Sequence, residues 1–236
     1  MKSVQSSQVY RDEEFGDIPY RRVPHSQHVR IRMSTDGSLR ASLPLFAPLS
    51  SLKKLIDSSR GELQKITVST SSSDYRNGQQ IGHSHTLSLI PNRSNALKGS
   101  VSHQKVIVSY SETDDPSSPA VQAMIRTHIS QALRKESKAY LPRRLQYLAE
   151  QGQFSYKKIR FAHQSGRWGS CSASGTISLN IALMMLPFEL IDYVLVHELS
   201  HTVEMNHSPS FWRLVESYYP DYKNARKLLK THNPYL

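Results

Sequence analysis

The segment Pro187 to His201 reads PFELIDYVLVHELSH, and its last five residues form the pattern H-E-x-x-H. Apolar residues at positions 190, 191, 194 and 195 recur at helical spacing, and the proline suits the first position of a helix. Residues four apart lie on one helix face, so His197 and His201 can reach one ion with Glu198 beside them. This arrangement is typical of a catalytic zinc site, which needs a third protein ligand. A core helix with hydrogen-bonded histidines is the alternative, although burying ionisable groups without a partner is costly.

The third ligand has three candidates downstream of the motif: Glu204, His207 and Glu216. Ser208 and Pro209 suit the cap and the first position of a new helix, so the chain must turn between the motif and these residues. Such a turn can bring His207 back over the first helix, whereas Glu204 could bind only if that helix continued unbent. We therefore predict His207 as the third ligand, with a surface-loop histidine as the alternative. Glu204 stays a candidate for orienting a ligand imidazole.

The chemistry expected of such a site follows from its residue types. Zinc bound by imidazoles lowers the pKa of a bound water from 15.7 toward about 7 and polarises a carbonyl group. Glu198 can take the proton as general base and return it to the leaving group, a role worth roughly 10² to 10⁴ in rate. Arg167, Tyr193 or a backbone N–H could stabilise the oxyanion, and the sequence does not choose among them. A three-imidazole site without thiolates suits zinc well.

Several segments carry a resemblance to a known family. Four of them together resemble the YgjP-like zinc metallopeptidase family: RWGSCSASGTISLN at 167–180, PFELIDYVLVHELSH at 187–201, NHSPSFW at 206–212 and PDY at 220–222. The resemblance is dense from about residue 160 to 229. It extends weakly to RIRMSTDGSLRASL at 30–43, which looks like that family's opening hairpin. These HExxH proteins are similar to SprT-like and WLM-type protease domains.

The resemblance implies a function, a set of site residues and a fold. It implies zinc-dependent peptidase activity, with His197, His201 and His207 as metal ligands and Glu198 as the catalytic residue. It also implies an α+β fold, in which a small antiparallel sheet packs on a zincin-like metal-binding helix. An N-terminal part with a β-hairpin completes that fold. A peptide or protein is the expected substrate.

Composition bounds the class of protein. The 236 residues, 38% of them hydrophobic, can supply the core of one large domain or two small ones. The longest apolar run, 181–188, is far shorter than the roughly 18 to 20 residues of a membrane span, and residues 1–17 lack the apolar stretch of a signal peptide. A lone cysteine, Cys171, cannot form an intramolecular disulfide, which favours a cytoplasmic location. It reads equally well as a small buried thiol or a reactive one.

Charge keeps alternative functions open. Thirty Lys and Arg against 19 Asp and Glu give a net charge of +11, which attracts polyanions. Nucleotides and nucleic acids are therefore also candidate partners, although no recognition motif for either is present. The first alternative is a zinc-dependent nucleoside triphosphate pyrophosphohydrolase that uses the same zinc and Glu198. A second is a protease acting on nucleic-acid-associated proteins, and a third is a nucleic-acid-associated protein in which the zinc is structural.

The pattern along the chain predicts three parts. Residues 1–20 read as a flexible lead-in, 21–115 as a β-rich part and 116–236 as the zincin-like catalytic domain. In the second part, alternation on both sides of Asp36-Gly37 predicts a hairpin over 28–43. A helix over 52–66, capped by Ser50 or Ser51, should follow, then a polar loop over 69–83 and strands at 84–90 and 104–110.

In the third part a helix is expected from Pro119 to about Gln151, interrupted or kinked at Pro142. Strands at 157–162 and 176–183 should then form an antiparallel pair. The segment 167–180 would line a cleft in which a strand pairs with an extended peptide, with a tight hairpin and a core Trp168 as the alternative. Helices over 209–219 and 222–231 are expected after the zinc turn, the second capped by Asp221.

Overall fold

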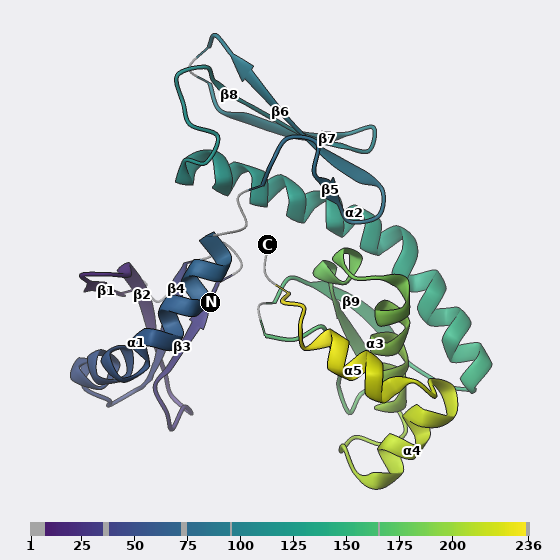
Figure 1. Cartoon of the computed structure of the whole chain (residues 1–236). Helices are drawn as coiled ribbons and strands as arrows, with labels where there is room; N and C mark the ends of the chain where they lie inside the picture. Colours follow the sequence, from purple (N-terminus) through teal and green to yellow (C-terminus); the bar gives the residue numbers. More distant parts are fainter. Residues whose placement is uncertain (1–7, 35–37, 72–74, 95, 165, 235–236) are drawn as a thin grey trace, which may run out of the picture. The chain divides into compact units, whose positions relative to one another are not determined.

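The computed structural model describes residues 8–34, 38–71, 75–94, 96–164 and 166–234, which form two compact units (Figure 1). The units are Met1–Ser73 and Asp74–Leu236, so the division lies at 73/74 and not at 115/116 as predicted. The reason is packing. Strand residues Leu87, Val106 and Val108 belong to the same buried core as Ile125 and Ile129 of the following helix. Residues 75–115 therefore bury their apolar face against the helix that follows them.

The first unit is a four-stranded sheet with one helix. Its strands are β1 (Gln8–Asp12), β2 (Gly16–Val23), β3 (Arg30–Met33) and β4 (Leu39–Pro44), in the order β1-β2-β4-β3, followed by α1 (Leu49–Ser71). The antiparallel pair β3–β4 confirms the predicted hairpin, whose turn Asp36-Gly37 lies outside the described residues. The helix begins slightly earlier than predicted and continues into the segment expected to be a loop.

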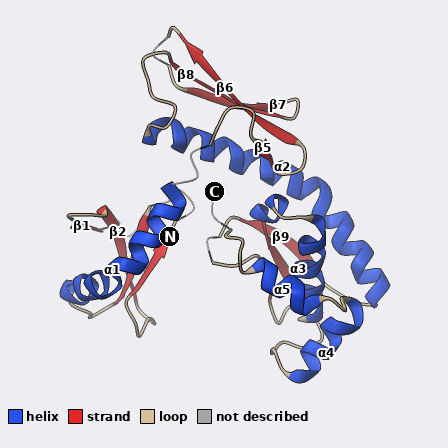
Figure 2. Cartoon of the chain, in the orientation of Figure 1, coloured by secondary structure: helices blue, strands red, loops and turns tan. Residues whose placement is uncertain are grey.

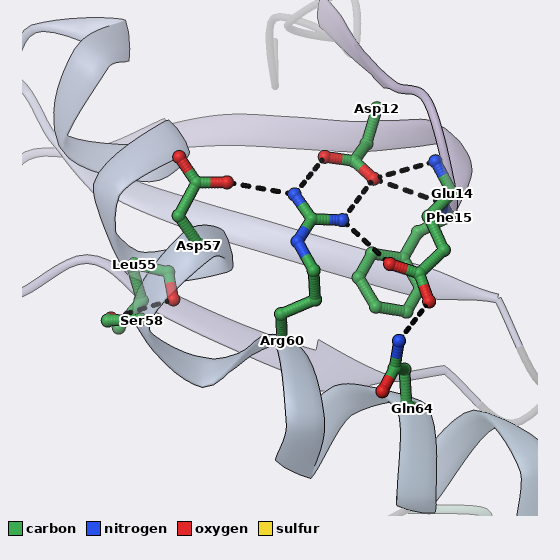
Figure 3. Close-up of polar contacts among 8 residues, drawn as sticks. All are labelled: Asp12, Glu14, Phe15, Leu55, Asp57, Ser58, Arg60 and Gln64. Atoms are coloured by element: carbon green, nitrogen blue, oxygen red, sulfur yellow. Dashed lines mark hydrogen bonds and ion pairs between the residues drawn. The ribbon is translucent and has the colours of Figure 1, made fainter.

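Residues 8–20 belong to β1 and β2, which differs from the predicted flexible lead-in. Tertiary contacts explain the difference (Figure 3). Arg60 of α1 lies 3.2 Å from Asp12, 2.8 Å from Glu14 and 2.8 Å from Asp57. Asp12 also accepts hydrogen bonds from the backbone N–H groups of Glu14 and Phe15. Burial alone would raise the pKa of Asp12, but the hydrogen bonds from Arg60 and from these amides lower it.

The second unit begins with a sheet that packs on a long helix (Figure 2). Its strands are β5 (Gln80–Ile81), β6 (His85–Asn92), β7 (Lys98–Ser102) and β8 (Lys105–Ser111), in the order β5-β6-β8-β7. The strands predicted at 84–90 and 104–110 are confirmed as β6 and β8, which pair in parallel. The sequence analysis missed β7, KGSVS, because it is short and carries few apolar residues.

The long helix α2 (Pro119–Gly152) continues through Pro142, so of the predicted interruption or kink, the interruption does not occur. Leu141 and Leu145 are fully buried on either side of this proline, and their packing stabilises the helix despite the missing N–H donor.

Glu136 of α2 anchors the β5–β6 turn. Its carboxylate accepts hydrogen bonds from the backbone N–H groups of His83 (2.9 Å) and Ser84 (3.0 Å), and it contacts His85 Nδ1 at 2.5 Å. Gly82 has a φ of +58°, and a Cβ atom there would lie 2.3 Å from the Glu136 carboxylate. The turn therefore requires glycine, both for its backbone and for the space that Glu136 occupies.

The second sheet of this unit is mixed. It contains β9 (Lys158–Ala162), β10 (Gly169–Cys171) and β11 (Thr176–Asn180) in the order β10-β11-β9. β9 and β11 pair in parallel, so the predicted antiparallel pairing of these two strands is wrong. The intervening segment contains β10, which runs antiparallel to β11 on its other side and thereby reverses the chain twice.

The remaining helices of the unit follow this sheet. They are the 3₁₀ helix η1 (Ile181–Met185), α3 (Phe188–Ser200), α4 (Pro209–Tyr218) and α5 (Tyr222–Leu229). Leu190, Ile191, Val194 and Leu195 of α3 are all buried, as their spacing predicts. α3 packs against α2, α4, α5 and β10, which places the motif helix at the centre of the unit. The α+β class is confirmed. No helix in the described part of the chain is long and apolar enough to cross a membrane.

Candidate metal centre

The three histidines singled out in the sequence converge in the structure. His197 and His201 lie one turn apart on the C-terminal end of α3, with ring centroids 4.8 Å apart, and His207 follows in the turn before α4. One nitrogen from each ring lies within 4.8 Å of the other two. Nε2 of His207 and Nε2 of His197 are 3.1 Å apart. Two nitrogens bound to one zinc at 2.0 to 2.1 Å in tetrahedral geometry would be about 3.3 Å apart, so the spacing fits such an ion.

Local structure explains how His207 returns to the helix. α3 ends at Ser200, and two short turns follow, in which the N–H of Glu204 donates to the carbonyl of Ser200 at 2.9 Å. Ser208 then caps α4 by accepting a hydrogen bond from the N–H of Phe211 at 3.3 Å, as its position before Pro209 predicts.

The other two candidate ligands are placed differently. The backbone carbonyl of Glu204 lies 3.0 Å from His201 Nδ1, which leaves Nε2 of that ring for an ion. Glu204 thus orients a ligand candidate, through its backbone and not its side chain. Glu216 lies on the exposed surface of α4, 3.4 Å from Lys223, and is no part of the cluster.

Two aromatic residues of α4 hold the histidine rings. Phe211 is fully buried and stacks on His201, with centroids 4.4 Å apart at 25°. Trp212 stacks on His207 at 5.5 Å and 26°, and Arg226 of α5 lies 4.6 Å from the Trp212 ring centroid. The sequence analysis had placed Phe211 and Trp212 in the helix expected over 209–219, without a role toward individual ligands. Their position directly after the N-H-S-P segment was the available signal.

Electrostatics favour neutral rings that can bind a cation. Burial lowers the pKa of His197 to about 3, and the neighbouring histidines and Arg226 act in the same direction. Burial also lowers the pKa of His201. The Nδ1 atom of His197 is buried and has no hydrogen-bond partner in the described structure. At neutral pH both rings therefore present unprotonated nitrogens, which is the form that binds a metal.

Glu198 lies beside the cluster in a buried position. Burial raises its pKa to about 8, while the charge of Arg167 acts in the opposite direction. Its Oε2 atom is buried without a hydrogen-bond partner among the described residues. A buried carboxylate without a partner is costly unless a cation or a substrate group compensates it. This orphaned atom is therefore a second indication that the site is built for a ligand.

Gly169 of β10 makes room for this carboxylate. A Cβ atom at position 169 would lie 2.6 Å from Glu198 Oε1 and 2.7 Å from its Cγ. The sequence analysis had placed Gly169 in the segment expected to line a cleft, without a contact to Glu198. No local pattern could reveal the contact, because it joins a strand and a helix that are far apart in the sequence.

A cavity of about 190 Å³ adjoins Glu198, and its wall consists of Trp168, Gly169, Tyr193, Val194, His197, Glu198 and Leu229. Trp168 is partly buried against the core and also lines this cavity, so both interpretations of its role apply. Asn180 positions the segment that carries Trp168. The Nδ2 atom of Asn180 donates to the carbonyls of Gln164 (2.6 Å) and Arg167 (2.9 Å). The backbone N–H of Asn180 donates to the Trp168 carbonyl at 2.9 Å.

The remaining site candidates lie near the cavity. Arg167 is exposed, whereas Tyr193 is buried in the cavity wall, 6.0 Å from His197 between ring centroids. Cys171 is half buried, and burial, followed by the charge of Glu198, raises the pKa of its thiol. A raised pKa disfavours the reactive thiolate.

Similarity to known proteins identifies the family of the chain. A solved structure, that of the metallopeptidase zymogen of Pyrococcus abyssi abylysin, is 28% identical to the chain; the match covers 38% of this chain and 91% of that one, with a TM-score of 0.36. Comparison with curated proteins gave no match. The family model described as YgjP-like, metallopeptidase domain, matches residues 27–232 and so covers most of both units. The chain therefore belongs to the YgjP-like metallopeptidase family.

Proposed function

We propose that this metallopeptidase is a zinc enzyme in which His197, His201 and His207 hold the ion and Glu198 is the general base. The observation that carries the proposal is the convergence of three imidazoles beside a buried carboxylate whose Oε2 has no partner. Imidazole nitrogens without thiolates or a second carboxylate at the cluster suit zinc. The orientation of His201 by the Glu204 carbonyl further supports the assignment.

Zinc held there would supply a bound water of lowered pKa and a Lewis acid for the scissile carbonyl. Glu198 would accept a proton from such a water at its carboxylate and would return it to the leaving amine. Burial raises the pKa of this carboxyl group, and a cation among the histidines would lower it again. The group can therefore serve as base first and as acid afterwards. The low-dielectric surroundings strengthen each of these interactions.

The sheet beside Glu198 suits an extended peptide. β10 pairs with β11 on one side and is the edge strand of its sheet, with Gly169 directly against Glu198. An edge strand offers backbone N–H and C=O groups to an added strand, which gives affinity with little dependence on sequence. A substrate side chain could then enter the 190 Å³ cavity at the base of this strand. These features favour a peptide or protein over a nucleoside triphosphate as substrate.

Replacing Glu198 by Gln tests the mechanism. We expect the variant to retain zinc, measured by atomic emission, and to lose roughly 10² to 10⁴ in the rate of hydrolysis of a peptide library. His201→Ala should lose both zinc and activity. Glu216→Gln is the matched control, because Glu216 lies on the exposed surface of α4 outside the histidine cluster, and it should leave both unchanged. An active Glu198→Gln enzyme would exclude Glu198 as the base.

The same preparation distinguishes the substrate classes. We expect release of peptide fragments and no release of phosphate or pyrophosphate from nucleoside triphosphates. Phosphate release that disappears in Glu198→Gln, together with intact peptides, would favour the pyrophosphohydrolase alternative instead.

A further inference from the structure

The first unit carries an arginine-rich sheet face that the peptidase site does not use. In β4, Leu39, Ala41 and Leu43 are buried, so Arg40 and Ser42 point to the opposite face. The buried strand residues and the buried Leu52 and Ile56 of α1 form the core of this unit. The outward face is therefore the one that the core leaves in contact with solvent.

Strand register brings several arginines together on this outward face. Arg21 of β2 lies opposite Ser42 in the parallel pair, and Arg30 of β3 lies opposite the same Ser42 in the antiparallel pair. Arg32 lies opposite Arg40 in the next row. Neighbouring strands are about 4.8 Å apart, and Arg30 and Arg32 are about 6.7 Å apart along β3. Arg21, Arg30 and Arg32 thus form a compact group of exposed guanidinium groups around Ser42.

Four acidic residues of the unit form ion pairs with other arginines. Asp12, Glu14 and Asp57 surround Arg60 (Figure 3), and Asp17 pairs with Arg11 at 2.8 Å. Among the described residues of the four strands, Asp17 is the one acidic residue on the outward face.

The arginine group therefore keeps its positive charge available. In the described part of the chain, no carboxylate forms an ion pair with Arg21, Arg30 or Arg32. Packing does not explain a concentration of like charge on one face, since adjacent like charges on a sheet are destabilising. A polyanionic ligand would compensate that cost.

We propose that this face, defined by Arg21, Arg30, Arg32 and Ser42, binds the phosphate backbone of a nucleic acid. Guanidinium groups match phosphate geometry through paired N–H donors and are weakly hydrated, which suits phosphodiester groups. Rows of charge separated by a few ångströms can contact successive phosphates, and the hydroxyl of Ser42 offers a further donor. The net charge of +11 draws polyanions toward the molecule. Binding here is separate from catalysis and would bring the peptidase to proteins that occupy nucleic acid.

Binding of the full-length protein to fluorescein-labelled 20-nucleotide single-stranded DNA and RNA, followed by fluorescence anisotropy between 50 and 200 mM KCl, tests the proposal. Each phosphate contact to a single strand contributes about 0.7 to the slope of log K against log salt, so Arg30→Gln/Arg32→Gln should reduce the slope by about 1.4. Over this fourfold salt range, the wild type should lose about sevenfold more affinity than the variant. Arg21→Gln, on a different strand, should act in the same direction with about half the change in slope.

Matched controls distinguish binding at this face from attraction by the overall positive charge of the protein. Lys53→Gln/Lys54→Gln removes the same charge from exposed positions of α1 and should leave the slope unchanged. Arg30→Lys/Arg32→Lys keeps the charge and the slope but loses the paired donors, so its affinity should fall between those of wild type and the glutamine variant. Peptide hydrolysis should be unchanged in all these variants, and their far-UV circular dichroism spectra should match that of the wild type, which shows that the first unit folds.

Three results would overturn the proposal. The first is an absence of binding at 50 mM KCl. The second is an equal reduction of the salt slope in Lys53→Gln/Lys54→Gln and in Arg30→Gln/Arg32→Gln. The third is arginine-dependent binding to phosphatidylserine vesicles without binding to either nucleic acid, which would assign the face to a membrane surface.

Discussion

Replacing Gly169 by Ala should displace the carboxylate of Glu198, the proposed general base, without touching the three histidines proposed as metal ligands. The added Cβ would lie 2.6 Å from Glu198 Oε1, 2.7 Å from its Cγ and 2.9 Å from its Cδ. Ordinary contacts begin at about 3.4 Å, so the carboxylate or β10 must move by about 0.8 Å. A misplacement of about 1 Å in a catalytic group can cost about 10²-fold in rate. We therefore expect kcat for peptide hydrolysis to fall by about 10²-fold.

Zinc content and zinc affinity of Gly169→Ala should remain those of the wild type, because the three histidines come from α3 and the turn before α4. Gly166→Ala is the matched control, since a Cβ atom there meets nothing within 4 Å. Steady-state kinetics on one peptide, with zinc measured in the same samples, decides the outcome. Unchanged kcat in Gly169→Ala would refute the reasoning that β10 sets the position of Glu198, and loss of zinc would show that the strand supports the ligands instead.

Two further predictions concern residues that support the site and the fold. Trp212→Leu removes the ring that stacks on His207, so its zinc affinity should fall about tenfold or more, measured by competition with a chromophoric chelator. Trp212→Phe should retain most of the affinity. Equal zinc affinities of wild type and Trp212→Leu would exclude a role of this ring in supporting His207. Glu136→Gln weakens the hydrogen bonds that hold the β5–β6 turn, and should lower the unfolding free energy at pH 7 by about 2 kcal/mol in urea denaturation. Burial opposes ionisation of Glu136, but its hydrogen bonds lower its pKa below 4.5. The difference in unfolding free energy between wild type and Glu136→Gln should therefore be complete above pH 4.5 and shrink as the pH falls through the lowered pKa. A difference independent of pH would contradict this account, and Glu150→Gln, at an exposed position, is the control.

Much of the fold could be predicted from local patterns. The β3–β4 hairpin, α1, α2, α4 and the strands β6 and β8 all lie close to their predicted ranges, because alternation, helical spacing and caps are properties of short segments. The errors concern relations between segments. β1 and β2 read as a loose lead-in because their order depends on Arg60, more than 40 residues away. The pairing of β9 with β11 was wrong because strand direction depends on where β10 inserts.

Asp221 illustrates the same limit on a smaller scale. Its position before α5 predicts a side-chain cap, yet it forms no such bond and instead accepts a hydrogen bond from Asn224 at 3.2 Å. A cap depends on backbone angles at one residue, and these depend on how the preceding turn packs.

The candidate site also combines features set by local sequence with features set by contacts between separate segments. The sequence by itself determined which residues could hold a metal and act as base, because the spacing of His197, Glu198 and His201 on one helix, and the turn signal at Ser208, are local. Only the tertiary structure decided that Gly169 lies against Glu198 and that Trp212 stacks on His207. It also decided that Arg21 and Arg30 share one row of a sheet. Each of these relations depends on strand order, register or helix packing between separate segments, and burial of a common core selects that arrangement where no local pattern can encode it.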